Sequence, residues 1–270
     1  MLTNPRSTFC LIAAGLAVTA LAASVSGLAT AQDVRRSIKA DDLLPGPEVV
    51  KSLEASVKTL QAGTKSASEF NQKAKALENE AYTFAMLVQS SRGTEEMAKK
   101  SGPLTEAALA LAAAARKKDF NEARKQVAIL ADFKKVEGSG SAESVDLGKA
   151  VPVKNLMMVV RDVDQELKKA TRLTAANWNQ KGKPEEIANH ANRMVATTLA
   201  MLQHTPEKDP DAKKGQTSKV WRETSKETQD ACLELAKAAR AKKPDDFKKA
   251  YMAMDKACTK CHEVYRVEED

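Results

Sequence analysis

Three residues in the C-terminal part of the sequence have the types and the spacing for covalent attachment of a metal cofactor. Cys258, Cys261 and His262 form a C-x-x-C-H motif, which is typical of haem attachment. Thiols at positions i and i+3 of a helix project from one face, where they can add across the two vinyl groups of a haem. His262 can bind the iron through an imidazole nitrogen. The motif predicts one covalent haem c per chain.

Other chemistries fit these residues less well. A C-x-x-C disulfide requires no following histidine, and a zinc site requires a fourth ligand that no nearby residue supplies. The Glu-rich helices raise a di-iron bundle as an alternative, but the sequence lacks the Glu-x-x-His pairs of such sites. The sequence also contains no Ser/His/Asp set and no phosphate-binding glycine loop. We therefore expect a haem protein that is not an enzyme.

The N-terminal residues have the pattern of a secretory signal peptide. Arg6 precedes an apolar run over residues 9–28, and Ala29-Thr30-Ala31 offers small residues for cleavage. We expect residues 1–31 to be a signal peptide that is cleaved near Ala31, which makes the mature protein periplasmic. An uncleaved membrane anchor is the alternative, because the apolar run is nearly long enough to span a bilayer.

The charge of the chain is basic but diffuse. The formal net charge is +7, without a tail or block of one sign, and aromatic residues make up only 4 % of the chain. Nucleic-acid binding is therefore not expected, since both a basic block and stacking platforms are missing. Mild basicity could still steer the protein towards acidic redox partner proteins.

Two segments of the chain look like copies of one helical unit. The matching stretches are residues 106–116 with 230–240, residues 85–87 with 200–202, and Phe120 with Phe247. The same alignment places Ala131, Lys134 and Lys135 opposite the C-x-x-C-H motif. The first copy therefore keeps the scaffold but has no side chain there that could attach or ligate a haem.

Each copy is predicted to contain four amphipathic helices, each with one buried and one wetted face. Ser66 and Glu69 form a capping box, and Pro184 and Pro244 are each followed by acidic residues that mark helix starts. No segment has the alternating apolar and polar pattern that predicts a β-strand. We expect an all-α protein with two tandem four-helix bundles. Residues 41–137 form the haemless bundle, 138–149 a linker and 150–270 the haem domain.

Several of these residues resemble the cytochrome c′ family, class II c-type cytochromes that include six-coordinate, c556-like members. They are Val220-Trp221, Asp246-Phe247 and the run C-x-x-C-H-x-x-Y-R that ends at Arg266. The resemblance covers Val151 to Arg266 and, more faintly, the first copy. It implies a left-handed four-helix bundle in which His262 is the proximal ligand. It also implies that the first helix of the bundle supplies the distal pocket.

The distal residue separates two subtypes of that family. In c′ members an apolar residue blocks the iron, which stays five-coordinate and binds small gases such as NO and CO. In c556-like members a methionine on the first helix binds the iron. None of the eight residues after His262 is Met or His, so a sixth ligand is expected upstream. At about 100° per residue, Met157 lies on the apolar side of the helix that faces the bundle interior, and Met158 lies on the solvent-facing side. Met157 is therefore the better candidate for the sixth ligand.

The remaining histidines and Cys232 are weaker candidates for site residues. His190 and His204 are expected at the surface, although either could replace Met157, because imidazole binds haem iron readily. Cys232 is expected to be a small buried apolar residue. In the first copy, Glu54 stands where the second has Met157.

Three functions remain after this reasoning. The first is one-electron transfer with redox partner proteins, which His262 and Met157 ligation would favour. The second is a five-coordinate, gas-binding haem protein. The third is an interaction protein in which the first copy docks a partner. A homodimer is left open.

Overall fold

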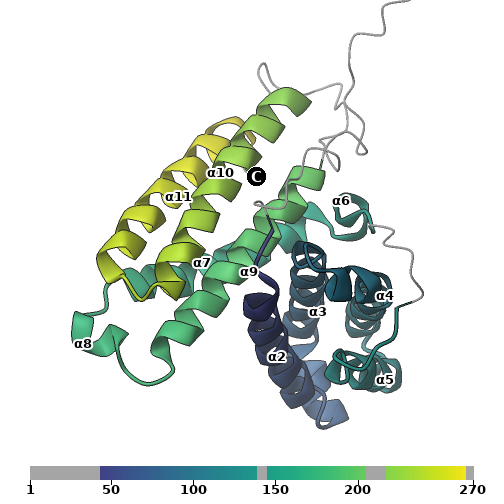
Figure 1. The fold of residues 1–270 in the computed structure, drawn as a ribbon. Helices are drawn as coiled ribbons and strands as arrows, with labels where there is room; N and C mark the ends of the chain where they lie inside the picture. Colours follow the sequence, from purple (N-terminus) through teal and green to yellow (C-terminus); the bar gives the residue numbers. More distant parts are fainter. Residues whose placement is uncertain (1–42, 139–144, 205–216, 266–270) are drawn as a thin grey trace, which may run out of the picture.

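The computed structural model describes residues 43–138, 145–204 and 217–265 (Figure 1). The predicted signal peptide at residues 1–31, residues 139–144 of the predicted linker, and Arg266 lie outside this range. The described residues form helices joined by turns, without a strand, so the all-α fold class is confirmed. Among these helices, none has both the length and the apolar character needed to cross a lipid bilayer.

The helices fall into two groups of four long helices each. The N-terminal group consists of α2 (Gly46–Gly63), α3 (Ala67–Ser90), α4 (Glu95–Lys117) and α5 (Phe120–Ala131). The C-terminal group consists of α7 (Val153–Thr171), α9 (Lys183–Gln203), α10 (Ser218–Arg240) and α11 (Pro244–Tyr265). The short helices α6 (Leu147–Ala150) and α8 (Ala175–Trp178) flank α7, and α6 includes the last residues of the predicted linker.

Local sequence signals set the starts of these helices. The Ser66 side chain accepts a hydrogen bond from the Glu69 amide at 3.2 Å, which confirms the predicted cap of α3. Thr217 caps α10 in the same way through the Val220 amide. Proline occupies the first turn of α9, and α11 begins at Pro244. Proline is favoured there because the first amides of a helix have no intrahelical acceptor.

Within each group the four helices contact one another in the same order. In the N-terminal group α2 packs on α3, α3 on α4, α4 on α5, and α5 returns to α2. In the C-terminal group α7 packs on α9, α9 on α10, α10 on α11, and α11 returns to α7. Each group therefore has the connectivity of a four-helix bundle. The order of contacts is thus the same in both groups, while the duplication of one helical unit stays a prediction.

The two groups are joined by a broad contact, which we call the seam. At the seam α3 packs on α9, α2 also contacts α9, and α3 also contacts α7. Figure 1 shows α9 running between the two groups. One continuous cluster of buried apolar residues extends through both, from Leu53 and Leu87 to Val195 and Leu235.

The seam changes the burial of two helices. Every residue from 77 to 91 in and after α3 is buried, as is every residue from 194 to 202 of α9. The expectation of one wetted face per helix is therefore wrong for these stretches. Both helices pack inside their own group on one side and against the other group on the opposite side. The predicted domain limits at residues 41–137 and 150–270 stay predictions.

Candidate functional site

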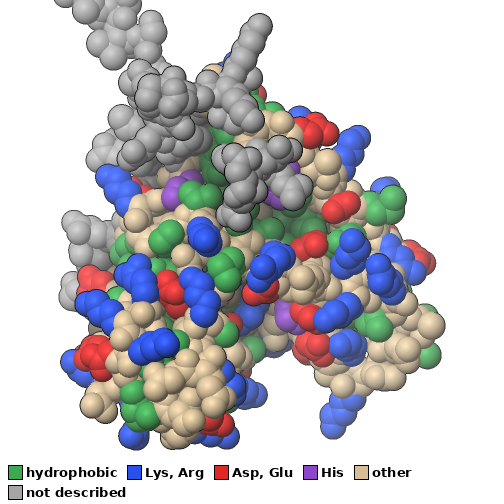
Figure 2. All heavy atoms as spheres, turned by 180° about the vertical axis from the view of Figure 1, so that it is seen from behind, with side chains coloured by type: hydrophobic (Ala, Val, Ile, Leu, Met, Phe, Trp, Pro, Cys, Tyr) green, Lys and Arg blue, Asp and Glu red, His purple; other side chains and the backbone are tan. Residues whose placement is uncertain are grey.

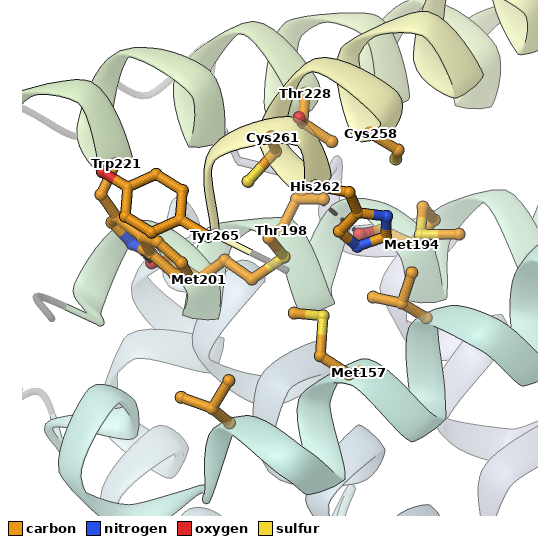
Figure 3. A pocket seen from close by; sticks show the side chains of 12 residues that line it. Met157, Met194, Thr198, Met201, Trp221, Thr228, Cys258, Cys261, His262 and Tyr265 are labelled. Atoms are coloured by element: carbon orange, nitrogen blue, oxygen red, sulfur yellow. Dashed lines mark hydrogen bonds between the residues drawn. The ribbon is translucent and has the colours of Figure 1, made fainter. Parts of the chain in front are cut away.

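A cavity of about 220 Å³ lies inside the C-terminal group and is lined by residues of α7, α9, α10 and α11. Figure 3 shows side chains from these helices converging on it. The lining is mainly apolar and carries sulfur atoms on several sides, from two cysteines and three methionines. The bundle thus brings the residues of the C-x-x-C-H motif together with residues far upstream in the chain.

The α11 wall of the cavity carries Cys258, Cys261 and His262. α11 continues without a break to Tyr265, so the two cysteines lie one helical turn apart on one face. Cys261 is buried, Cys258 is half-buried and His262 is exposed at the edge of the cavity. Neither cysteine is in a disulfide.

The surroundings of the two thiols favour their neutral form. Burial, with the Asp164 carboxylate as the next cause, raises the pKa of the Cys258 thiol to about 12. Burial also raises the pKa of Cys261, and a hydrogen bond with Thr224 opposes that rise. Both thiols therefore sit in an apolar environment suited to a large apolar ligand.

The α7 wall faces α11 and carries Val153, Met157 and Val160. Figure 3 shows Met157 from α7 and His262 from α11 projecting into the same space. Met157 is half-buried and packs against the core. Met158, the next residue, is not among the residues that line the cavity. The helical spacing thus identified the cavity-facing methionine, while ligation of an iron by Met157 stays a prediction.

The α9 wall contributes three residues that the sequence did not single out as site residues. Met194, Thr198 and Met201 line the cavity, and each lies one turn from the next. The Thr198 hydroxyl donates to the Met194 carbonyl at 3.1 Å and to the Gln229 side chain of α10. The helical spacing of Met194 and Thr198 predicted that they lie on the buried face of their helix. The sequence alone gave no signal that this part of the buried face borders a cavity.

An aromatic pair closes one end of the cavity. The rings of Trp221 on α10 and Tyr265 on α11 meet edge to face, with centroids 4.9 Å apart. The Trp221 indole N–H donates to the Met201 carbonyl at 2.9 Å, and the Tyr265 hydroxyl donates to the Thr217 carbonyl at 2.6 Å. These two bonds fix both rings against the ends of α9 and α10.

A side-chain hydrogen bond also connects α11 to α7 beside Cys258. The Tyr251 hydroxyl donates to the Asp164 carboxylate at 2.8 Å. Burial, together with this hydrogen bond, raises the pKa of Tyr251 well above its ordinary value. The link holds the wall that carries the cysteines against the wall that carries Met157.

The two other histidines of the chain do not line the cavity. His204 is half-buried, and its Nε2 lies 2.9 Å from the Val151 carbonyl oxygen. His190 is also half-buried, and burial lowers its pKa. Both were expected at the surface, and the structure shows both half-buried. Cys232 is fully buried, as expected, and burial raises its pKa well above the ordinary value.

The residues of the cavity fit a covalently attached haem. They provide two thiols on one helical face, an imidazole beside them, and a thioether on the opposite wall, within an apolar enclosure. Thiolate or thioether, imidazole and apolar walls are the features by which proteins hold haem.

The comparisons with known proteins point to the same part of the chain. Residues 161–266 match the family model described as Cytochrome C'. The matched segment contains α8 to α11 and most of α7, and it begins after Met157. Comparisons with curated proteins and with solved structures gave no match.

Proposed function

Because its segment 161–266 belongs to the cytochrome c′ family, whose members bind haem c covalently, we propose that this protein is a periplasmic one-electron carrier. Its single haem would be attached through Cys258 and Cys261, with His262 as proximal and Met157 as distal ligand. The observation that carries the proposal is the shared cavity, in which the α11 motif faces Met157 on α7. When bound, haem c supplies an iron that alternates between ferric and ferrous states.

The proximal side is built by α11 alone. Cys258 and Cys261 would hold the cofactor edge along the helix, and His262 would direct its imidazole at the iron. The Tyr251–Asp164 hydrogen bond and the Trp221–Tyr265 pair fix α11 at both ends of the cavity. Such support limits how far the attached group can move, which is what an electron carrier requires of its scaffold.

The distal side determines which redox state is favoured. A thioether sulfur such as that of Met157 is a soft neutral donor, and His/Met ligation raises the reduction potential of haem iron. The neighbouring residues Val153, Val160, Met194 and Met201 would exclude water from this side. The cavity wall offers threonine hydroxyls but no carboxylate, so the proposal includes no catalytic acid or base and no enzyme activity.

The alternative function is gas binding at a five-coordinate iron. The observation that favours it is the apolar wall opposite the motif, where Val153 and Val160 border the cavity on either side of Met157. If Met157 only packs against the cofactor, its side chain and those of Val153 and Val160 would form an apolar distal pocket for CO or NO.

We also propose that the protein is exported and that it exchanges electrons with acidic redox partner proteins. The signal-peptide pattern of residues 1–31 supports export, and proteins of the cytochrome c′ family are typically periplasmic. Lys and Arg side chains are interspersed with Asp and Glu over the face seen in Figure 2, which suits transient contact with acidic redox proteins. N-terminal sequencing of the mature protein should give Gln32 as the first residue.

Absorption spectra of the purified holoprotein test the function directly. We expect a low-spin ferric spectrum with a weak sulfur-to-iron band at long wavelength, and little change when CO is added to the ferrous form. A high-spin ferric spectrum with ready CO binding would instead support the gas-binding alternative. An intact mass that shows no haem, or two, would rule out both.

A further inference from the structure

The N-terminal group packs directly behind the distal wall of the cavity. On α9, Met194, Thr198 and Met201 line the cavity, whereas Asn192 and Arg193 face the N-terminal group. The Asn192 amide donates to the Ser52 hydroxyl of α2 at 3.1 Å, and the Arg193 guanidinium pairs with Glu80 of α3. At about 100° per residue, Asn192 lies nearly opposite Met194 and Met201. One helix therefore forms the cavity wall on one side and the seam on the other.

α7 has the same two-sided arrangement. Met157 points into the cavity, and Asn155, two residues earlier and so on the opposite side of the helix, is buried in the seam. The Asn155 amide donates to the side-chain oxygen of Asn79 on α3 at 3.0 Å. Val159 and Val163 of α7 also face α3 across a cleft in the seam. The helix that carries Met157 is thus supported from behind by the N-terminal group.

The seam has an approximately twofold arrangement. α3 meets α9, its counterpart in the repeat, while each first helix contacts the second helix of the other group: α2 with α9, and α7 with α3. The polar contacts show the same reciprocal pattern. Ser52 of α2 forms a hydrogen bond with Asn192 of α9, and Asn155 of α7 forms one with Asn79 of α3. Ser52 and Asn155 correspond in the alignment that places Glu54 opposite Met157. Reciprocal contacts of this kind define an isologous interface, the form that joins two copies of one subunit.

The centre of the seam contains buried polar groups that specify its geometry. The Ser56 hydroxyl donates to Glu80 at 2.5 Å, and the same carboxylate pairs with Arg193. The Arg240 guanidinium of α10 donates to Asn192 at 3.2 Å. Buried polar pairs add little net stability, but they penalise any arrangement that separates the partners. The two groups are therefore held in one relative position.

We propose that the N-terminal group serves as a built-in partner subunit, which covers the back of α7 and α9 and thereby positions the distal wall, with Met157, relative to His262. This inference rests on the proposed function for the identity of the haem site. Protein interiors are close-packed, so a displacement of α7 or α9 at the seam is transmitted to the side chains on their other face. A thioether can bind iron only at a fixed distance, and a small retreat of α7 releases it. The full chain is monomeric, because the face that would pair with a second copy is already covered.

Charge reversal at the seam tests this in the full-length holoprotein. Arg193→Glu places a second carboxylate beside Glu80, and Glu80→Arg combined with Arg193→Glu restores an opposite-charge pair. For Arg193→Glu we expect a mixed-spin ferric spectrum and a rate of CO association at least about tenfold faster, and the double variant should return to within about twofold of the wild type. Lys134→Glu, which breaks an exposed ion pair in the same group, is the matched control and should leave the spectrum unchanged.

A milder variant covers the case in which Arg193→Glu does not fold. Asn79→Ala removes the partner of Asn155 on α7 and should raise the CO association rate by a smaller factor. If these variants lower the unfolding temperature but keep the wild-type spectrum and CO rate, the positioning role is wrong. In sedimentation velocity, wild type and Arg193→Glu should both be monomers. A wild-type dimer that Arg193→Glu dissociates would mean that the seam joins separate chains, and would overturn the proposal.

The test separates this inference from the proposed ligation. A wild-type protein that is already high-spin would refute Met157 ligation. The seam would still be tested by the CO association rate, because the same wall borders the gas-binding side.

Discussion

The two four-helix groups of this chain share one framework and differ at the place where the haem chemistry would occur. In the C-terminal group α11 runs unbroken to Tyr265, and Cys261 and Met157 border a cavity. In the N-terminal group α5 ends at Ala131, the residue aligned with Cys258. Lys134 and Glu54, aligned with Cys261 and Met157, form an ion pair at 2.5 Å. A four-helix bundle alone therefore does not make a haem site.

The N-terminal group also has its own packing around the end of its fourth helix. Phe133 is buried just after α5 and meets the ring of Phe84 edge to face, with centroids 6.4 Å apart. The Lys100 ammonium donates to the Lys134 carbonyl at 2.7 Å and so closes the turn. The N-terminal group therefore has a shorter fourth helix, with an aromatic contact and an ion pair near its end, at the positions that align with the end of α11.

The largest expected effect comes from the attachment residues. Replacing Cys258 and Cys261 by Ala should abolish covalent haem, because both vinyl groups lose their thiol partners. Denaturing gels stained for haem and intact mass measure this. Cys232→Ala is the matched control, since Cys232 is a buried cysteine that does not itself line the cavity, and it should keep one haem. Covalent haem in the double variant would refute the assignment.

The next effect concerns the distal wall. Met157→Ala should convert a low-spin ferric haem to high spin and raise the CO affinity by about a hundredfold if Met157 is off the iron about 1 % of the time. Met158→Ala should leave spectrum and affinity unchanged, because Met158 does not line the cavity. Equal effects of the two substitutions would show that Met157 is not the ligand.

Transferring the motif to the N-terminal group tests the comparison most directly. The variant Glu54→Met, Ala131→Cys, Lys134→Cys, Lys135→His carries the donor set at the aligned positions. We expect it to bind only one haem, because α5 ends at Ala131 and the two new thiols would not lie on one helical face. A mass corresponding to two haems would show that the donor set is sufficient and that helix length is not decisive.

The N-terminal group expressed alone, as residues 41–137, should be helical by circular dichroism, colourless and cooperative in thermal unfolding. A bundle with four apolar stripes can be stable without a cofactor. It should melt below the full chain, because the side of α3 that faces α9 is then exposed. A disordered fragment would mean that this group folds only on the haem domain.

The smallest effect is expected for the Lys134–Glu54 ion pair of the N-terminal group. Lys134 and Glu54 are 62 % and 45 % exposed, and ion pairs of this kind contribute about 0–1 kcal/mol. Lys134→Ala should therefore change the free energy of unfolding by no more than that. Chemical denaturation measures it, and a loss above about 2 kcal/mol would give the pair a structural role beyond surface electrostatics.

Local signals in the sequence were sufficient for the helix starts and for four of the twelve residues that line the cavity, namely Met157, Cys258, Cys261 and His262. The cap at Ser66 and the prolines at 184 and 244 marked helix starts correctly, and the helical period separated Met157 from Met158. These features depend on neighbours within one or two turns. The motif at Cys258 likewise carries its chemistry in five consecutive residues.

The seam and the rest of the cavity depend on contacts between distant segments. Ser52, Asn79, Asn155 and Asn192 are polar, so each looks like part of a wetted face, and only their mutual hydrogen bonds in the fold make their burial favourable. Trp221 lies in the cavity wall, where its indole N–H donates to the Met201 carbonyl of another helix. Pairings of this kind have no signature along a single helix.

The positions of the tryptophans have a practical consequence for following this molecule in solution. The chain contains two, Trp178 and Trp221, and both belong to the C-terminal half, the first packed on Phe247 and the second at the cavity wall. Tryptophan fluorescence, excited selectively, therefore reports on that half alone, and a nearby porphyrin would quench it. Far-ultraviolet dichroism reports on both halves. A difference between the melting temperatures from the two signals would therefore show that the two halves do not unfold in one cooperative transition.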